Sequence, residues 1–177
     1  MLITIRHGQT DLNKEQVFCG RSDLPKLTKE SIEEAYKKGK ELAKYNIDVA
    51  FISPLTRAKD TFNEINKSLN VKGFVLDELI ERDFKGYEAK SISLISREVY
   101  WNIDGDGSYD IEPLSDMVKR VERALNKIKE EYKDKNVLIV AHSGVCRVIR
   151  HIVEGKKENK LYTFKMENLH VDIFKEW

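Results

Sequence analysis

Two histidines each follow directly on a short apolar run of the sequence. His7 comes after Leu2 to Ile5, and His142 comes after Val137 to Ala141. Neutral imidazole can attack a phosphorus atom, so a histidine at the end of a buried strand is a candidate nucleophile. Arg6 precedes the first histidine, and a guanidinium group binds two phosphate oxygens at once. One such histidine would more often be an ordinary loop residue, but two of them together favour phosphoryl chemistry.

A second arginine lies where a helix is expected to begin. Ser53 and Pro54 are typical of an N-cap and a first helical position, which places Arg57 in the first turn. A cation there opposes the helix dipole and costs about 0.3–1 kcal/mol, so Arg57 is better placed for an anionic ligand than for stability. The alternative is an ordinary surface salt bridge to Asp60 or Glu64.

The backbone after the second histidine adds further donors. The N–H groups of Ser143 and Gly144 are expected at the start of a helix, where they bind anions. Together with Arg6, Arg57 and the two histidines, they form a set of donors that fits a phosphoryl group. Groups that bind phosphate do not by themselves catalyse its transfer. When imidazole attacks phosphorus, a carboxylic acid must also protonate the leaving oxygen. We therefore expect a glutamate or aspartate near the same place.

Apolar patterns predict the elements that position these groups. The expected strands span 2–5, 49–52, 74–76, 136–141, 161–164 and 171–174, and the expected helices span 28–45, 53–69, 115–132 and 143–153. Loop and irregular helix are expected over 78–110. Strands that alternate with helices predict an α/β fold of three layers, α/β/α, with a mostly parallel central sheet. Ligands bind beyond the carboxyl ends of such strands, which brings the histidines and arginines to one edge.

Length, composition and charge limit the class of protein. The chain has 177 residues, which at about 150 residues per domain predicts one domain over 1–177, with a small lid at about 85–114. The formal net charge is +1, so we expect neither a nucleic-acid partner nor a membrane partner. The apolar runs are too short to span a bilayer, and no signal-peptide pattern is present, which predicts a cytoplasmic protein.

The remaining candidates for a metal site are weak. Asp104 to Asp110 begins like a calcium loop, but Tyr109 stands where a glycine is required and Ser115 where a glutamate is required. His151 and His170 have no partner at metal-ligand spacing. We expect a loop in the first case and structural or surface histidines in the second.

Four segments of the chain resemble the motifs of the histidine phosphatase superfamily, which includes the cofactor-dependent phosphoglycerate mutases. They occur in the family's order and span most of the chain. The segments are Arg6-His7-Gly8-Gln9-Thr10 with Asn13, Gly20-Arg21-Ser22-Asp23 and Leu27-Thr28; Ser53-Pro54-Leu55-Thr56-Arg57-Ala58 with Thr61; Leu79-Ile80-Glu81-Arg82-Asp83-Phe84; and Val140-Ala141-His142-Ser143-Gly144-Val145 with Arg147. The resemblance implies a phosphoglycerate mutase-like fold.

The resemblance also implies catalytic roles for five residues. His7 would be the nucleophile and become a phosphohistidine, and Glu81 would protonate the leaving oxygen and later activate water. Arg6, Arg57 and His142 would surround the phosphoryl group and stabilise its charge in the transition state. Neither a metal nor any other cofactor is implied.

Further positions are implied in binding phosphate or substrate. Asn13 would contact one phosphate oxygen and the backbone N–H of Ser143 another. Cys19 and Gly20 lie in the part of the motif that forms the phosphate pocket. Cys19 stands where a hydroxyl-bearing residue is frequent, and a small buried apolar residue is the favoured alternative to a reactive thiol.

The short lid favours a phosphatase over a mutase. A mutase must keep water away from its phosphohistidine, whereas a phosphatase admits water. About thirty residues separate Glu81 from the helix expected at Ser115. We therefore expect a metal-independent phosphomonoesterase for a small phosphorylated metabolite. It resembles the α-ribazole phosphatase and broad-specificity phosphatase groups, with α-ribazole 5′-phosphate as one candidate substrate.

Two alternatives stay open, a cofactor-dependent phosphoglycerate mutase and an inactive relative that binds phosphorylated ligands as a regulatory module. The sequence does not determine the oligomeric state, and a homodimer is one option. Specificity is expected in the loop 21–25 and in 85–110, where aromatic side chains either stack on a substrate ring or, as we favour, pack the lid. These side chains are Tyr87, Tyr100, Trp101 and Tyr109.

Overall fold

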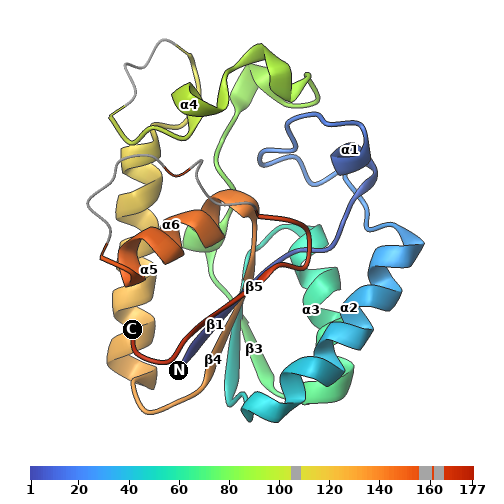
Figure 1. The fold of residues 1–177 in the computed structure, drawn as a ribbon, viewed down its shortest axis with the longest axis vertical. Helices are drawn as coiled ribbons and strands as arrows, with labels where there is room; N and C mark the ends of the chain where they lie inside the picture. The colour runs from blue at the N-terminus through green and yellow to red at the C-terminus, as the bar shows by residue number, and fades with distance from the viewer. Residues whose placement is uncertain (105–108, 156–160, 162–165) are drawn as a thin grey trace.

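A five-stranded sheet forms the centre of the structure, a computed structural model that describes residues 1–104, 109–155, 161 and 166–177 (Figure 1). Its strands are β1 (Leu2–Arg6), β2 (Val49–Ile52), β3 (Lys72–Val75), β4 (Val137–Ala141) and β5 (Val171–Phe174). They lie in the order β3-β2-β4-β1-β5. Strand β5 is antiparallel to β1, and the other neighbouring pairs are parallel. The prediction of an α/β fold with a mostly parallel sheet is confirmed.

Helices cover both faces of this sheet (Figure 1). On one face lie α2 (Lys29–Leu42) and α3 (Thr56–Leu69), and on the other lie α5 (Leu114–Tyr132) and α6 (Ser143–Val153). The shorter elements are α1 (Asp11–Lys14), α4 (Arg97–Tyr100) and the 3₁₀ helices Ala43–Tyr45, Asp77–Leu79, Lys85–Tyr87 and Ile92–Leu94. A membrane span would need a longer and more apolar helix than any in the described ranges.

Strand β4 shows why the fold has three layers. Val137, Ile139 and Ala141 belong to the buried cluster that contains α5 and α6. Leu138 and Val140 belong to the cluster that contains α2 and α3. All five residues are buried, because a strand between two helical layers is covered on both faces. The continuous apolar run of this segment is the sequence signal of that position.

Helix α3 begins three residues later than the sequence pattern predicts. Leu55 occupies its N-cap position, and its side chain makes no capping hydrogen bond. Asp23 supplies the missing acceptor from a distant loop, since its carboxylate accepts hydrogen bonds from Thr56 N at 2.6 Å and from Thr56 Oγ1 at 2.8 Å. The prediction of Ser53 as the N-cap is wrong, because its hydroxyl lies against His142 instead.

The other boundaries differ little from the prediction. Thr28 caps α2 as expected and accepts a hydrogen bond from Ser31 N at 3.2 Å. The strand predicted at 161–164 lies outside the described residues except for Leu161. The central part of the loop predicted at 104–110 lies outside them as well.

The segment that joins β3 to α5 lies over the carboxyl edge of the sheet (Figure 1). Arg82 holds it together, because Nε donates to the carbonyl of Glu112 at 2.7 Å and a second guanidinium nitrogen donates to the carbonyl of Tyr100. Phe84 stacks on Phe18, with ring centroids 4.4 Å apart. This segment, predicted as loop and irregular helix, is therefore packed against the loop that follows α1.

Helices α2 and α3 pack so closely at Gly39 that no side chain fits between them. A methyl group added there would overlap the backbone of Ile65, including its carbonyl oxygen. Gly39→Ala should therefore lower the free energy of unfolding by about 1–3 kcal/mol, although alanine favours a helix by about 1 kcal/mol over glycine. Urea denaturation measures this change.

Gly86→Ala is the matched control, because a methyl group at Gly86 would meet no heavy atom within 4 Å. It should change the free energy of unfolding by less than about 0.5 kcal/mol. Equal destabilisation by the two substitutions would rule out the α2–α3 contact as the cause.

Candidate active site

His7 follows β1, where its backbone N–H donates to the carbonyl of Ala141 at 2.8 Å. The ring is buried, and its Nδ1 lies 2.7 Å from the carbonyl oxygen of Gly8. A carbonyl accepts and never donates, so Nδ1 carries the proton and Nε2 keeps its lone pair. Burial, and then the charges of Arg57 and Arg6, hold the pKa of His7 well below its usual 6.5. The imidazole is therefore neutral and nucleophilic at Nε2.

Among the described residues, Arg6 and Arg57 are two of the four arginines that line the same cavity as His7. Arg6 donates from Nη1 to the carbonyl of Met166 at 2.6 Å. Arg57 donates from Nη1 to the carbonyl of Ser22 and from Nη2 to that of Gly20, each at 2.7 Å. These acceptors are neutral, so they orient the cations without cancelling their charge. A surface salt bridge, the alternative for Arg57, is wrong, because its side chain is buried.

His142 follows β4 and is fully buried, with its ring centroid 5.2 Å from that of His7. Its Nε2 lies 2.6 Å from Oγ of Ser53. This hydroxyl accepts a hydrogen bond from Leu55 N at 3.3 Å and can also donate its own proton to Nε2. In that tautomer the ring proton is on Nδ1, which is buried and has no hydrogen-bond partner among the described residues. Burial, and then the charge of Arg57, lower the pKa of His142 well below its usual value, so this ring is also neutral.

The carboxylate of Glu81 lines the cavity and is largely buried. Its oxygens accept hydrogen bonds from Arg82 N at 2.8 Å and from Gly144 N at 3.1 Å. A side chain at position 144 would collide with this carboxylate, so the close approach requires glycine. Arg21 Nε and Arg120 Nη2 hold the backbone carbonyl of Glu81, both at 3.2 Å. The N–H of Gly144, expected to bind phosphate, donates to Glu81 instead.

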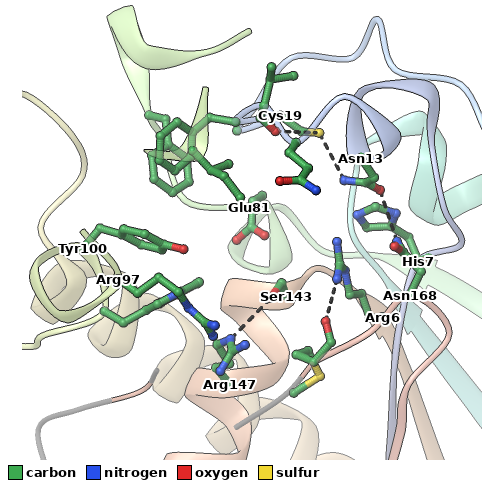
Figure 2. A pocket seen from close by; sticks show the side chains of 18 of the residues that line it. Arg6, His7, Asn13, Cys19, Glu81, Arg97, Tyr100, Ser143, Arg147 and Asn168 are labelled. Atoms are coloured by element: carbon green, nitrogen blue, oxygen red, sulfur yellow. Dashed lines mark hydrogen bonds between the residues drawn. The ribbon is translucent and has the colours of Figure 1, made fainter. Parts of the chain in front are cut away.

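Asn13, Cys19 and Asn168 form a chain of hydrogen bonds along one wall (Figure 2). Asn13 donates from Nδ2 to Sγ of Cys19 at 3.4 Å, and its Oδ1 accepts from Nδ2 of Asn168 at 3.1 Å. Asn168 also donates to the carbonyl of His7 at 3.1 Å. Sequence reasoning missed Asn168, because no motif marks it and 161 positions separate it from His7.

The other residues expected to bind phosphate or substrate, Cys19, Gly20 and Ser143, also line the cavity. Cys19 is only partly buried, so it is not the small buried apolar residue that we favoured, and desolvation raises the pKa of its thiol. Gly20 has a φ of +49°, a conformation that favours glycine, and its carbonyl orients Arg57. Ser143 accepts a hydrogen bond at Oγ from Nε of Arg147 at 3.3 Å.

The cavity has a volume of about 340 Å³ and brings together four of the five expected catalytic residues, Arg6, His7, Arg57 and Glu81. The fifth, His142, does not line it but packs against the ring of His7. Among the described residues, no three His, Cys, Asp or Glu side chains are grouped so that they could hold a metal ion. A neutral imidazole, two cations and a carboxyl group around one cavity suit the transfer of a phosphoryl group.

Comparison with known proteins gives the family. The model of the histidine phosphatase superfamily, branch 1, matches residues 2–176, so the chain belongs to this superfamily. It is a phosphoric monoester hydrolase.

Individual relatives differ in activity. The uncharacterized phosphatase PhoE of Bacillus subtilis is 30% identical over 151 residues, which cover 85% of this chain and 76% of the relative. A 2,3-bisphosphoglycerate-dependent phosphoglycerate mutase of Bradyrhizobium diazoefficiens is 29% identical over 170 residues, with coverages of 87% and 81%. The α-ribazole phosphatase of Shigella flexneri matches with a TM-score of 0.81 at 24% identity, over 98% of this chain and 91% of that one. This last likeness shows a common fold.

Ser53→Ala removes the hydroxyl that contacts Nε2 of His142. The ring is then free to carry its proton on Nε2, and it loses the partner that orients it against the ring of His7. We expect kcat for p-nitrophenyl phosphate to fall about 10–100-fold, with KM changing less than about threefold. Nitrogen-15 NMR of His142 reports the change of tautomer directly.

Ser31→Ala is the control for this experiment. Ser31 is equally buried, lies on α2, and its hydroxyl has no hydrogen-bond partner among the described residues. Its removal should leave kcat within about twofold. An unchanged kcat and tautomer in Ser53→Ala would contradict the role of Ser53 in positioning His142.

The two buried neutral histidines make stability depend on pH. In the unfolded chain they titrate near their usual 6.5, whereas in the folded protein their pKa values lie well below it. Below pH 6.5 the unfolded state therefore binds more protons, and the free energy of unfolding should fall by up to about 1.4 kcal/mol per pH unit for each histidine. Above pH 6.5 their contribution is constant.

Urea denaturation between pH 7.5 and 5.5 in phosphate-free buffer measures this slope. His7→Gln should make the slope less steep, because one of the two groups no longer titrates. A slope that is the same in the wild type and in His7→Gln would exclude His7 as a source of the pH dependence.

Proposed function

We propose that the protein hydrolyses a small phosphorylated metabolite without a metal ion, through a phosphohistidine at His7. The observation that carries this proposal is the hydrogen bond from Nδ1 of His7 to the carbonyl of Gly8. It leaves Nε2 unprotonated in a residue that shares its cavity with Arg6 and Arg57. The nucleophile and the donors that stabilise charge are thus in place before the substrate binds.

The reaction has two steps. In the first, Nε2 of His7 bonds to phosphorus as the ester P–O bond breaks, and Glu81 gives its proton to the leaving oxygen. In the second, Glu81 takes a proton from water, whose oxygen bonds to phosphorus as the P–N bond breaks. Arg6 and Arg57 balance the charge on the phosphoryl oxygens in both steps, while His142 packs against the ring of the nucleophile. Phosphate leaves, and neutral His7 and protonated Glu81 are restored.

The length of the segment after Glu81 favours hydrolysis over phosphoryl transfer to a second substrate position. A mutase is the second candidate function, supported by the mutase relative that is 29% identical. Such an enzyme needs a site closed to water, and only about thirty residues lie between Glu81 and α5 to close it. α-Ribazole 5′-phosphate is one candidate substrate, since an α-ribazole phosphatase shares the fold.

Hydrolysis of p-nitrophenyl phosphate in the presence of EDTA tests the proposal. His7→Ala should lower kcat/KM at least about 1,000-fold, because no other group replaces the nucleophile. Rapid quenching at alkaline pH with a radiolabelled ester should trap phosphohistidine in the wild type but not in this variant. His170→Gln, which removes a histidine outside the cavity, should retain full activity.

Glu81→Gln tests the proton donor separately. It should lower kcat/KM for an alkyl phosphate about 100–1,000-fold but that for p-nitrophenyl phosphate much less, because p-nitrophenolate leaves without a proton. Folded wild-type protein that forms no phosphohistidine would refute the mechanism. Interconversion of phosphoglycerates faster than phosphate release would identify a mutase instead.

A further inference from the structure

Two arginines of the cavity have no part in the two-step reaction. Arg97 lies on α4 and Arg147 on α6, and both line the cavity that contains His7. In Figure 2 they lie together on one side of Glu81, with Arg6 and His7 on its other side. The cavity therefore has two cationic ends with the proton donor between them.

Arg147 is held rigidly without a carboxylate. Its Nε donates to Oγ of Ser143 at 3.3 Å and its Nη1 to the carbonyl of Leu161 at 2.7 Å. The guanidinium group lies over the ring of Trp101, 5.1 Å from the centroid. Its side chain is buried, and no ion pair with a carboxylate of the described residues neutralises it. A buried cation with neutral partners attracts an anion to its surroundings.

Arg97 adds a second positive charge close to the first. Burial, and then the repulsion from Arg97, lower the pKa of Arg147 to about 10. Arg147 therefore stays protonated at neutral pH. An anion bound beside them would relieve this repulsion, since like charges in a partly desolvated cavity disfavour each other.

The place of Glu81 determines what part of the substrate reaches this pair. Glu81 protonates the bridging oxygen, so that oxygen must lie beside its carboxyl group. The phosphoryl group then extends toward His7 and Arg6, and the leaving group extends in the other direction. Arg97 and Arg147 lie on that side.

We propose that Arg97 and Arg147 form a second anion subsite, and that the preferred substrate is a short phosphomonoester whose leaving group carries a carboxylate or a second phosphate. This inference rests on the proposed hydrolysis at His7. A cavity of about 340 Å³ suits a substrate whose second anion lies only a few bonds from the ester. A bidentate guanidinium group recognises either kind of anion.

The aromatic side chains of the cavity are poorly placed to stack on an aromatic ring of the substrate. Tyr100 packs against Trp101 at 5.0 Å, Phe18 at 5.7 Å and Phe84 at 6.2 Å between ring centroids. One face of Trp101 is covered by Arg147. These contacts support the sequence-based preference for packing, and they disfavour a substrate that is recognised through an aromatic base, such as α-ribazole 5′-phosphate.

The test compares two esters that differ in one group. 3-Phosphoglycerate and glycerol 3-phosphate have the same three-carbon chain, but the first ends in a carboxylate and the second in a hydroxymethyl group. Wild-type kcat/KM should be at least about tenfold higher for 3-phosphoglycerate. Glycerol 1,3-bisphosphate is the third substrate, and its rate relative to the other two shows whether the subsite prefers carboxylate or phosphate.

Arg97→Gln tests the subsite, because Arg97 is exposed on a short helix and its replacement spares the core. It should reduce the preference for 3-phosphoglycerate at least about fivefold and leave kcat/KM for p-nitrophenyl phosphate within about twofold. Arg123→Gln removes the same charge from an exposed position of α5 outside the cavity, and should change neither value.

Binding to His7→Ala separates this inference from the proposed function. Calorimetry with that variant should give a lower Kd for 3-phosphoglycerate than for glycerol 3-phosphate, and Arg97→Gln in the same background should abolish the difference. Equal Kd values, or equal losses on all esters in Arg97→Gln, would overturn the subsite. A retained binding preference in a protein that hydrolyses no ester would overturn the proposed function alone.

Discussion

Burial of positive charge at the carboxyl edge of the sheet is the constraint on which the site depends. A buried guanidinium group is costly unless its N–H groups meet acceptors. Arg6 and Arg57 meet backbone carbonyls, which are neutral, and form no ion pair with a carboxylate of the described residues. The fold thus satisfies some of their N–H groups, leaves Nε of each without a partner among the described residues, and keeps the charge available to a ligand. Burial, and then the charge of Arg57, keep His7 and His142 neutral.

Arg120, which has a structural role, has a charged partner instead. Arg120 makes two hydrogen bonds to the carboxylate of Glu112, at 2.7 and 3.0 Å, and also donates to the carbonyls of Glu78 and Ile80, both at 2.7 Å. Its charge is neutralised, and its role is to hold the segment that carries Glu81. Arg120 therefore differs from Arg6, Arg57 and Arg147, whose hydrogen bonds within the described residues go to neutral acceptors and whose charge remains available to a ligand.

The sequence predicted the layers and most of the residues around the cavity. Buried strands such as β4 are continuous apolar runs, and the histidines follow two strands that the sheet pairs in parallel, so the approach of His7 to His142 follows from local signals and one topological rule. Interactions between distant segments were not predictable. The cap of α3 by Asp23, the contact of Ser53 with His142 and the hydrogen bonds of Asn168 each join residues whose local sequence gives no sign of the partner.

The cap by Asp23 has a consequence for how the protein fluctuates. The loop that carries Asp23 also supplies the Gly20 and Ser22 carbonyls to Arg57, which stands in the first turn of the helix that Asp23 caps. The loop and the start of the helix therefore stabilise each other through these hydrogen bonds. Local opening of one of them weakens the hydrogen bonds that hold the other. An anion held by Arg57 should therefore slow amide hydrogen exchange in the first turn of α3, because binding in the cavity stabilises the start of this helix.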